Sequence, residues 1–208
     1  DGSGGYYQTV NKTTPVAGDV KYVDRNGDGV VDDNDRDIIG NPNPDFTYGF
    51  QTKVSWKSLS LSASFNGVQG RDILNVGNRY NNTPGTKSNN VTRKAFQNMW
   101  TDENPSNLYP KSTFVVQNMV MDRYVEDGSY LRCSDITLSY VLPAKWTNKI
   151  GIKNTSVYAS VKNAFVITDY SGYDPEVNSF AFDGLRPGVD MNSYPTPRSF
   201  VFGLNLTF

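Results

Sequence analysis

Five stretches of the sequence alternate between two kinds of side chain with a period of two, and this pattern restricts the fold more than any other feature. In the first stretch, residues 46–57, one set of alternate positions reads Phe46, Tyr48, Phe50, Thr52, Val54, Trp56. Successive side chains of a β-strand point to opposite faces, so this spacing is typical of a strand with one apolar face. The other four stretches are at about 59–70, 130–142, 157–168 and 199–208. The sequence therefore predicts an all-β protein.

The connections between these strands are very unequal. Those after the first and third strands are short, whereas residues 71–129 and 171–198 form two long links rich in Asn, Gly, Pro, Ser and Tyr. In an up-and-down antiparallel sheet, this order places every long loop at one end, as in outer-membrane barrels. A soluble β-sandwich would show the same alternation. The loop asymmetry and the aromatic residues near the strand ends favour the barrel.

Composition excludes several classes of function. The chain has no His, which removes the commonest zinc ligand and the usual proton shuttle near neutral pH. Its 20 basic and 21 acidic residues nearly cancel, so no overall charge attracts nucleic acid. The sequence has no run of about 18 apolar residues, so it predicts no membrane helix. The single Cys133 is expected to be a packing residue in a strand.

One short motif carries ion-binding chemistry. Residues 24–35 match the template of a calcium-binding loop, which takes oxygen ligands at positions 1, 3, 5, 7, 9 and 12 and a Gly at position 6. Calcium is a hard cation that prefers six to eight oxygens. We expect a structural calcium ion to be held by the side chains of Asp24, Asn26, Asp28, Asp32 and Asp35 and by the carbonyl of Val30.

Two features qualify this prediction. Asp35 stands where the template has Glu, and its side chain is one methylene shorter, so bidentate binding is left open. No helical pattern flanks the loop, which indicates an ion that fixes a loop rather than a sensor switch. The alternative is an acidic, solvated turn that binds nothing.

Two pairs of carboxylates in the long loops could suit glycoside hydrolysis, Glu126 with Asp127 and Asp174 with Glu176. Neither pair has a recognisable positioned partner, so we do not expect an enzyme. Aromatic residues of the long loops, such as Tyr80, Trp100 and Tyr109, could stack on sugars or simply order the loops.

In combination, several blocks of sequence resemble the late part of the SusC/RagA family of TonB-dependent outer-membrane transporters. The resemblance covers roughly residues 18–208. Its blocks, in order, are 18–22, the 24–35 loop, 37–44, 46–50, 66–70, 125–132, 136–140, 171–177 and the segment from Tyr194 to Phe208.

The resemblance implies the C-terminal part of a barrel of about 22 strands in the bacterial outer membrane. It implies import of glycans or peptides together with a SusD-like surface lipoprotein, driven by TonB. A plug and the other strands would come from the remainder of the chain. It also implies that residues 1–45 form an extracellular loop segment, and that Phe208 is the aromatic signal read during barrel assembly. The alternative from another class is a secreted, calcium-stabilised β-sandwich that binds carbohydrate.

Overall fold

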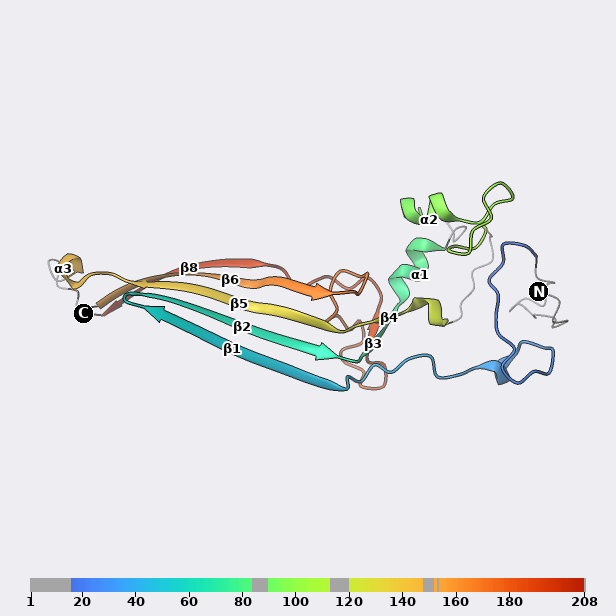
Figure 1. The fold of residues 1–208 in the computed structure, drawn as a ribbon, viewed down its shortest axis with the longest axis horizontal. Coiled ribbons are helices and arrows are strands. Elements are labelled where there is room, and N and C mark those ends of the chain that lie inside the picture. The colour runs from blue at the N-terminus through green and yellow to red at the C-terminus, as the bar shows by residue number, and fades with distance from the viewer. Residues whose placement is uncertain (1–15, 84–89, 113–119, 148–151, 153, 208) are drawn as a thin grey trace. The chain divides into compact units, whose positions relative to one another are not determined.

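A computed structural model of the chain describes residues 16–83, 90–112, 120–147, 152 and 154–207. Its main element is a five-stranded sheet in the order β1-β2-β5-β6-β8, in which every neighbouring pair is antiparallel (Figure 1). The strands are β1 (Phe46–Trp56), β2 (Leu59–Gln69), β5 (Tyr130–Val141), β6 (Asn154–Thr168) and β8 (Ser199–Thr207). The prediction of an all-β, antiparallel fold is therefore confirmed.

Short and long connections alternate along the sheet. Lys57 and Ser58 alone join β1 to β2, and Lys57 adopts a left-handed backbone conformation with φ of 54° to make the turn. The link from β5 to β6 includes the short helix α3 (Ala144–Thr147). No helix in the described parts of the chain is long and apolar enough to cross a membrane.

The long links contain regular structure that alternation did not predict. The link from β2 to β5 holds β3 (Asp72–Asn75), α1 (Val76–Asn82), α2 (Arg93–Asn98), the 3-10 turn η2 (Asp122–Tyr124) and β4 (Val125–Asp127), and the link from β6 to β8 holds β7 (Val189–Asp190). The strands β4, β3 and β7 form a second, small sheet. The helices begin at capping side chains, because Asn75 accepts from the amide of Asn78 and Thr92 from that of Ala95.

The chain divides into two compact units, which are described separately below. The first comprises residues 1–40 and 74–125, and the second comprises residues 41–73 and 126–208. The second unit therefore contains the whole five-stranded sheet, and most of the long link after β2 belongs with the N-terminal segment. The 3-10 turn η1 (Asp33–Asp35) lies in the first unit.

The buried apolar residues of the second unit gather where the long links meet the strand ends. Val68, Tyr130 and Cys133 of the sheet are buried there, together with Tyr170 of the link after β6. The register of both neighbouring strands shifts at Ser134, which indicates a β-bulge in β5. Cys133 is fully buried, as expected of a packing residue. Over the rest of their length the strands have no such core.

Candidate functional site

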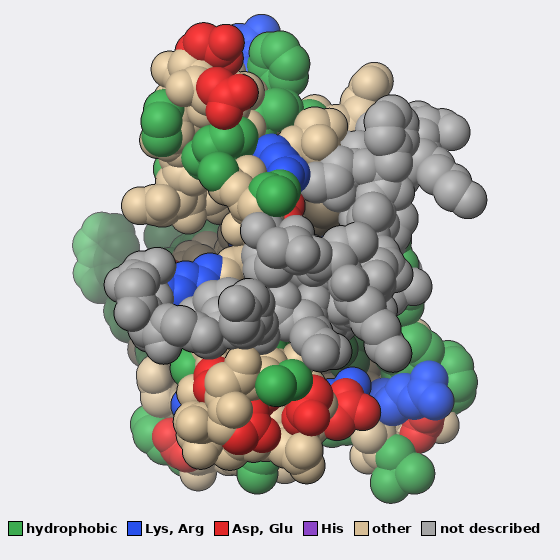
Figure 2. Space-filling view, turned by 90° about the vertical axis from the view of Figure 1, so that its right-hand side faces the viewer, with side chains coloured by type: hydrophobic (Ala, Val, Ile, Leu, Met, Phe, Trp, Pro, Cys, Tyr) green, Lys and Arg blue, Asp and Glu red, His purple; other side chains and the backbone are tan. Residues whose placement is uncertain are grey.

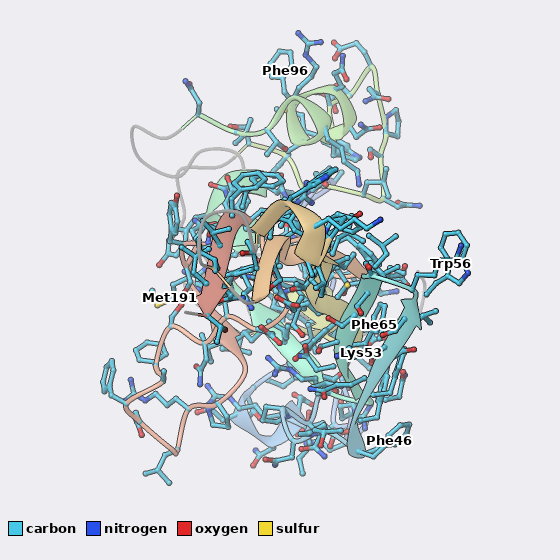
Figure 3. The ribbon with its side chains drawn as sticks, turned by 90° about the vertical axis from the view of Figure 1, so that its left-hand side faces the viewer. Phe46, Lys53, Trp56, Phe65, Phe96 and Met191 are labelled. Atoms are coloured by element: carbon cyan, nitrogen blue, oxygen red, sulfur yellow. The ribbon has the colours of Figure 1, made fainter. Side chains whose placement is uncertain are left out.

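The register of the five strands brings their apolar alternate positions onto one continuous face. Phe50 pairs with Phe65, Phe65 with Cys133, and Cys133 with Phe165, and the same alignment continues through β8. The large side chains of this apolar face are exposed: Phe202 keeps 78% and Trp56 69% of its surface accessible, and Trp56 projects away from the sheet (Figure 3). Further exposed members are Phe46, Val54, Leu59, Leu61, Leu138, Tyr140, Val157, Ile167, Phe200, Leu204 and Leu206.

The opposite face of the same sheet is polar. All four charged residues of the five strands lie on it, namely Lys53, Arg132, Asp135 and Lys162. Asp135 forms an ion pair with Lys162 at 2.5 Å and accepts hydrogen bonds from Thr137 and Ser160. The sheet thus has two different faces, with all four strand charges on one and most of the large exposed apolar side chains on the other.

At one end of the polar face, a cluster of ion pairs fixes the link between β6 and β8. Arg132 contacts Asp174 at 2.5 Å and Glu176 at 3.2 Å, and Glu176 also accepts hydrogen bonds from Tyr130 at 2.6 Å and Asn66 at 3.0 Å. Only 5% of Arg132 and 2% of Asp174 is exposed. The link is therefore anchored by buried, paired charges.

The charge of Asp174 is stabilised by its local contacts. Burial disfavours the ionised carboxylate, but the amides of Glu176 and Thr196 donate to it at 2.9 and 3.1 Å, and Arg132 adds a positive charge. Together these contacts outweigh burial and lower the pKa of Asp174. Because Asp174 and Glu176 share one arginine inside this cluster, their arrangement is that of a structural anchor rather than an acid and base flanking a substrate.

The predicted calcium loop lies in the first unit and is organised by its own side chains. Asp24 accepts hydrogen bonds from the amides of Gly27 and Gly29 at 2.7 and 2.8 Å, and both glycines have positive φ. Asp35 reaches back across the loop, where the amide of Asp32 donates to it at 2.7 Å and that of Arg25 at 2.8 Å. These amide bonds lower the pKa of Asp35.

The remaining predicted ligands of this loop make only local hydrogen bonds. Asn26 accepts from the amide of Asp28, Asp28 from that of Val30, and Asp32 from that of Asn34. Within the described residues, no three His, Cys, Asp or Glu side chains are grouped so that they could hold a metal ion. The oxygen-rich donor set suits calcium, but these carboxylates are directed at backbone amides rather than at one common point. Figure 2 shows acidic side chains in two places, in the lower part of the view and at its top.

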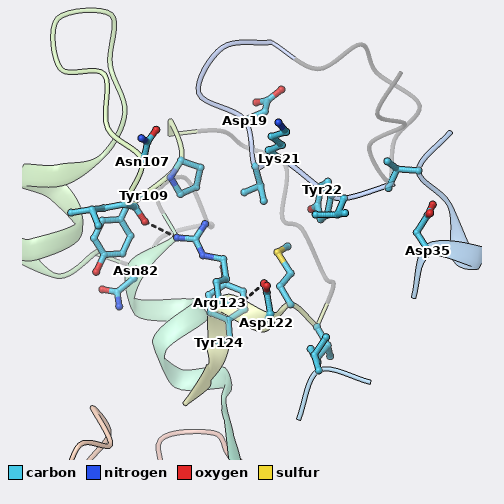
Figure 4. Close-up of a pocket in the computed structure, with 18 of the residues that line it drawn as sticks. Asp19, Lys21, Tyr22, Asp35, Asn82, Asn107, Tyr109, Asp122, Arg123 and Tyr124 are labelled. Carbon is cyan, nitrogen blue, oxygen red and sulfur yellow. Dashed lines mark hydrogen bonds between the residues drawn. The ribbon is translucent and has the colours of Figure 1, made fainter. Parts of the chain in front are cut away.

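A pocket of about 1120 Å³ also lies within the first unit (Figure 4). Its walls include Tyr22, Tyr109 and Tyr124, together with Arg123, whose guanidinium donates to the carbonyl of Leu108 at 2.7 Å. Burial raises the pKa of Tyr22 to about 12. Aromatic rings beside charged and amide groups can bind a polar ligand. Of these residues, the sequence indicated only Tyr109 as a possible ligand-binding residue, because the walls come from segments far apart in the chain.

Phe208, the predicted assembly signal, lies outside the described residues. The carboxylate pair Glu126 and Asp127 serves local structure, since Glu126 accepts from the amide and hydroxyl of Ser171 and Asp127 from the amide of Ser129.

Known proteins similar to this chain are receptors and importers of one kind. The TonB-dependent receptor P26 of Formosa agariphila is 35% identical over 201 residues, which cover 93% of this chain and 20% of the relative. The TonB-dependent receptor SusC of Bacteroides thetaiotaomicron is 34% identical over 194 residues, covering 90% of this chain and 17% of SusC. No protein-family model matches the sequence.

Solved structures agree with these relatives. The RagAB peptide importer in its open-open state superposes with a TM-score of 0.70 at 28% identity, covering 96% of this chain and 20% of the importer chain. Its closed-closed state also gives a TM-score of 0.70, at 29% identity over 82% of this chain. The chain thus spans about a fifth of the length of the proteins it matches. On this evidence, the chain belongs to the SusC/RagA family of TonB-dependent outer-membrane transporters.

Proposed function

We propose that this chain forms part of the wall of an outer-membrane transport barrel, with its apolar face against lipid and its polar face toward the lumen. The observation that carries the proposal is the separation of charged residues from the large exposed aromatic side chains. Every charged residue of the five strands is on one face, and the other face exposes large hydrocarbon side chains. Lipid-facing and lumen-facing residues alternate in this way along the strands of membrane barrels.

The energetics favour lipid as the environment of the apolar face. Moving one large apolar side chain out of water is worth about 1.5–3 kcal/mol. Phe202, Trp56, Phe200 and Val54 each keep more than half of their surface exposed, so this stabilisation is largely unrealised in the isolated sheet. A β-sandwich would realise it by packing a second sheet on the same face. The second sheet here has strands of only two to four residues and leaves these side chains exposed.

A pair of spin labels on neighbouring residues tests this orientation. Phe202 lies on the apolar face and Val201 on the polar face, one step apart on β8. In the assembled transporter, a label at Phe202→Cys should collide mainly with oxygen dissolved in lipid, and a label at Val201→Cys mainly with a water-soluble nickel chelate. Cys133 is fully buried and should remain unlabelled. Equal accessibility of the two labels to both reagents would refute the proposal.

We further infer that the complete transporter imports glycans or peptides, with a SusD-like lipoprotein on its outer side and TonB as the source of energy. The support is similarity to a receptor named SusC and to an importer described as a peptide importer. A strain lacking the transporter should lose uptake of either fluorescent oligosaccharides or fluorescent peptides and recover it on complementation. Unchanged uptake of both oligosaccharides and peptides would contradict the inferred substrates. If no lipoprotein co-purified with a tagged transporter, the inferred SusD-like partner would be wrong.

The predicted calcium ion remains part of the proposal. Asp24, Asn26, Asp28, Asp32, Asp35 and the carbonyl of Val30 would hold it on an extracellular loop, where it would stiffen residues 24–35. Calorimetric titration of the chelator-treated transporter with calcium should give binding heat that Asp24→Asn abolishes. Asp33→Asn is the matched control, because Asp33 occupies a loop position that supplies no ligand and its side chain is 87% exposed. Identical titrations of both variants and the native protein would exclude calcium from this loop.

We also keep the assembly role of Phe208 as a proposal. Removing this residue should lower the fraction of transporter inserted in the outer membrane, measured by its heat-dependent mobility on gels. Normal insertion of the shortened protein would exclude the role.

A further inference from the structure

A small loop in the second unit exposes large apolar side chains although hydrogen bonds fold its backbone into turns. This finger loop comprises residues 179–189 and is closed at its base, where the amide of Ser179 donates to the carbonyl of Val189 at 2.8 Å. At its tip, Phe182 is 87% and Leu185 is 93% exposed. Large apolar side chains that lie close together and stay in water are typical of an interaction surface.

Internal contacts hold the finger loop in shape. The amide of Asp183 donates to the carbonyl of Phe180, and the amide of Arg186 to that of Asp183, so two turns follow each other directly. The ring of Phe180 lies edge-on to Phe182 with centroids 6.2 Å apart, and the guanidinium of Arg186 lies 5.4 Å from the Phe180 ring. The tip is therefore presented by a defined backbone rather than by a collapsed segment.

The charges of the tip cancel within the loop. Arg186 forms an ion pair with Asp183 at 3.3 Å, and the finger loop has no other charged residue. The surface that it offers is thus apolar and electrically neutral. A partner rich in charge would have to lose hydration without gaining an ion pair, so the matching surface is also apolar and uncharged.

The anchor of the link places the finger loop on the polar side of the sheet. The same link carries Asp174 and Glu176, which bind Arg132, Tyr130 and Asn66 of the polar face. A buried hydrogen bond of 2.7 Å from the hydroxyl of Tyr170 to Asp190 fixes the other side of the link. In Figure 3 the link extends to the lower left of the sheet, whereas Trp56 projects to its right. Because the anchoring contacts are all made with the polar face, lipid is not the expected environment of the link.

We propose that Phe182 and Leu185 dock onto an apolar, uncharged surface in the remainder of the same transporter polypeptide, enclosed by the barrel. This inference rests on the proposed function, which makes the polar face the inner face. The described chain spans about a fifth of its relatives, so most of the polypeptide that the barrel wall would enclose lies elsewhere in the sequence. A permanent contact with that part would remove both side chains from water.

Photo-crosslinking in the full-length transporter, in its native membrane, tests the proposal. A benzophenone amino acid replaces Phe182 in one variant and Leu185 in a second, so that misfolding of one leaves the test intact. Phe202 receives the same probe as a control, because it is the same residue type with 78% exposure on the opposite face. Irradiated products are digested and identified by mass spectrometry.

We expect both finger probes to join a peptide of the same polypeptide outside residues 1–208, and the Phe202 probe to join lipid. Adducts of the finger probes with a separate protein, with lipid, or with nothing would overturn the inference. If the finger probes gave one of these results while the Phe202 probe still joined lipid, the proposed orientation of the sheet would stand and only the docking proposal would be wrong. An absence of lipid adducts at Phe202 would count against the proposed function itself.

Discussion

Replacing Arg132 by Met should release the link between β6 and β8 from the sheet. Arg132 is the only cation paired with Asp174 and Glu176 in the described structure, at 2.5 and 3.2 Å. Methionine fills much of the same volume but has no donors and no charge. The substitution therefore leaves the carboxylate of Asp174, which is 2% exposed, without a counter-charge.

The expected cost follows from burial. Removing one partner of a buried ion pair costs about 3–5 kcal/mol, because the other charge remains desolvated. The side chain of Glu176 is 33% exposed and can regain hydration, so we expect the lower end, about 3 kcal/mol. That figure corresponds to an increase of about a hundredfold in local opening.

Hydrogen exchange followed by mass spectrometry measures this opening directly. The amides of Glu176 and Thr196 both donate to Asp174, so peptides that contain them should exchange about a hundredfold faster in the variant. Adding Asp174→Asn and Glu176→Gln to the same variant should restore part of the protection, since no unpaired charge then remains.

The matched control is Arg36→Met, which breaks an ion pair with Asp33 whose side chains are 72% and 87% exposed. Exposed pairs contribute about 0–1 kcal/mol, so exchange should change by less than about fivefold. If Arg132→Met had no larger effect than Arg36→Met, the anchor would not hold the link, and the placement of the finger loop would lose its basis.

Three further predictions concern charge, pH and packing. Because the pKa of Asp174 is lowered in the folded state, its contribution to stability should be complete above the ordinary pKa of about 4 and be lost as the pH falls below that value. The melting temperature of Asp174→Asn should lack this acid-dependent drop. Parallel curves of melting temperature against pH for the variant and the native protein would refute the assignment. Phe202→Arg should cost about 2–4 kcal/mol near the middle of the bilayer, whereas Val201→Arg faces the lumen and should assemble normally, as read from heat-dependent gel mobility. Gly67→Ala should destabilise the sheet by about 1–3 kcal/mol in urea titrations, because a tyrosine ring fills the space of the new methyl group; Gly49→Ala, whose methyl group would lie 3.3 Å from the nearest carbonyl, should cost less.

The sequence predicted the fold class from backbone geometry alone. Because successive side chains of a strand point to opposite faces, the alternation from Phe46 to Trp56 indicated a strand before any pairing was known. That strand is β1, and the last one, expected at 199–208, is β8 (Ser199–Thr207). The anchor, in contrast, was invisible in the sequence. Arg132 and Asp174 are 42 residues apart, and only the pairing of β5 with its neighbours brings them together.

The calcium loop shows the limit of a local motif. Its 12 residues fixed the turn, since Asp24 and Asp35 bind the amides of their own loop, but spacing did not determine where each oxygen points. The pocket of the first unit could not be predicted from the sequence for the opposite reason, because its walls come from five separate segments of the chain.

The sequence by itself determined which residues alternate, and therefore that each strand has an apolar and a polar side. Only the tertiary structure decided that these sides coincide from strand to strand. A register shift of one residue between β5 and β6 would have moved Arg132 and Asp135 onto the side of Phe165, while β5 kept its register with Phe65 of β2. The observed register keeps every charge of the sheet on one face, because pairing by backbone hydrogen bonds fixes the faces of all five strands together.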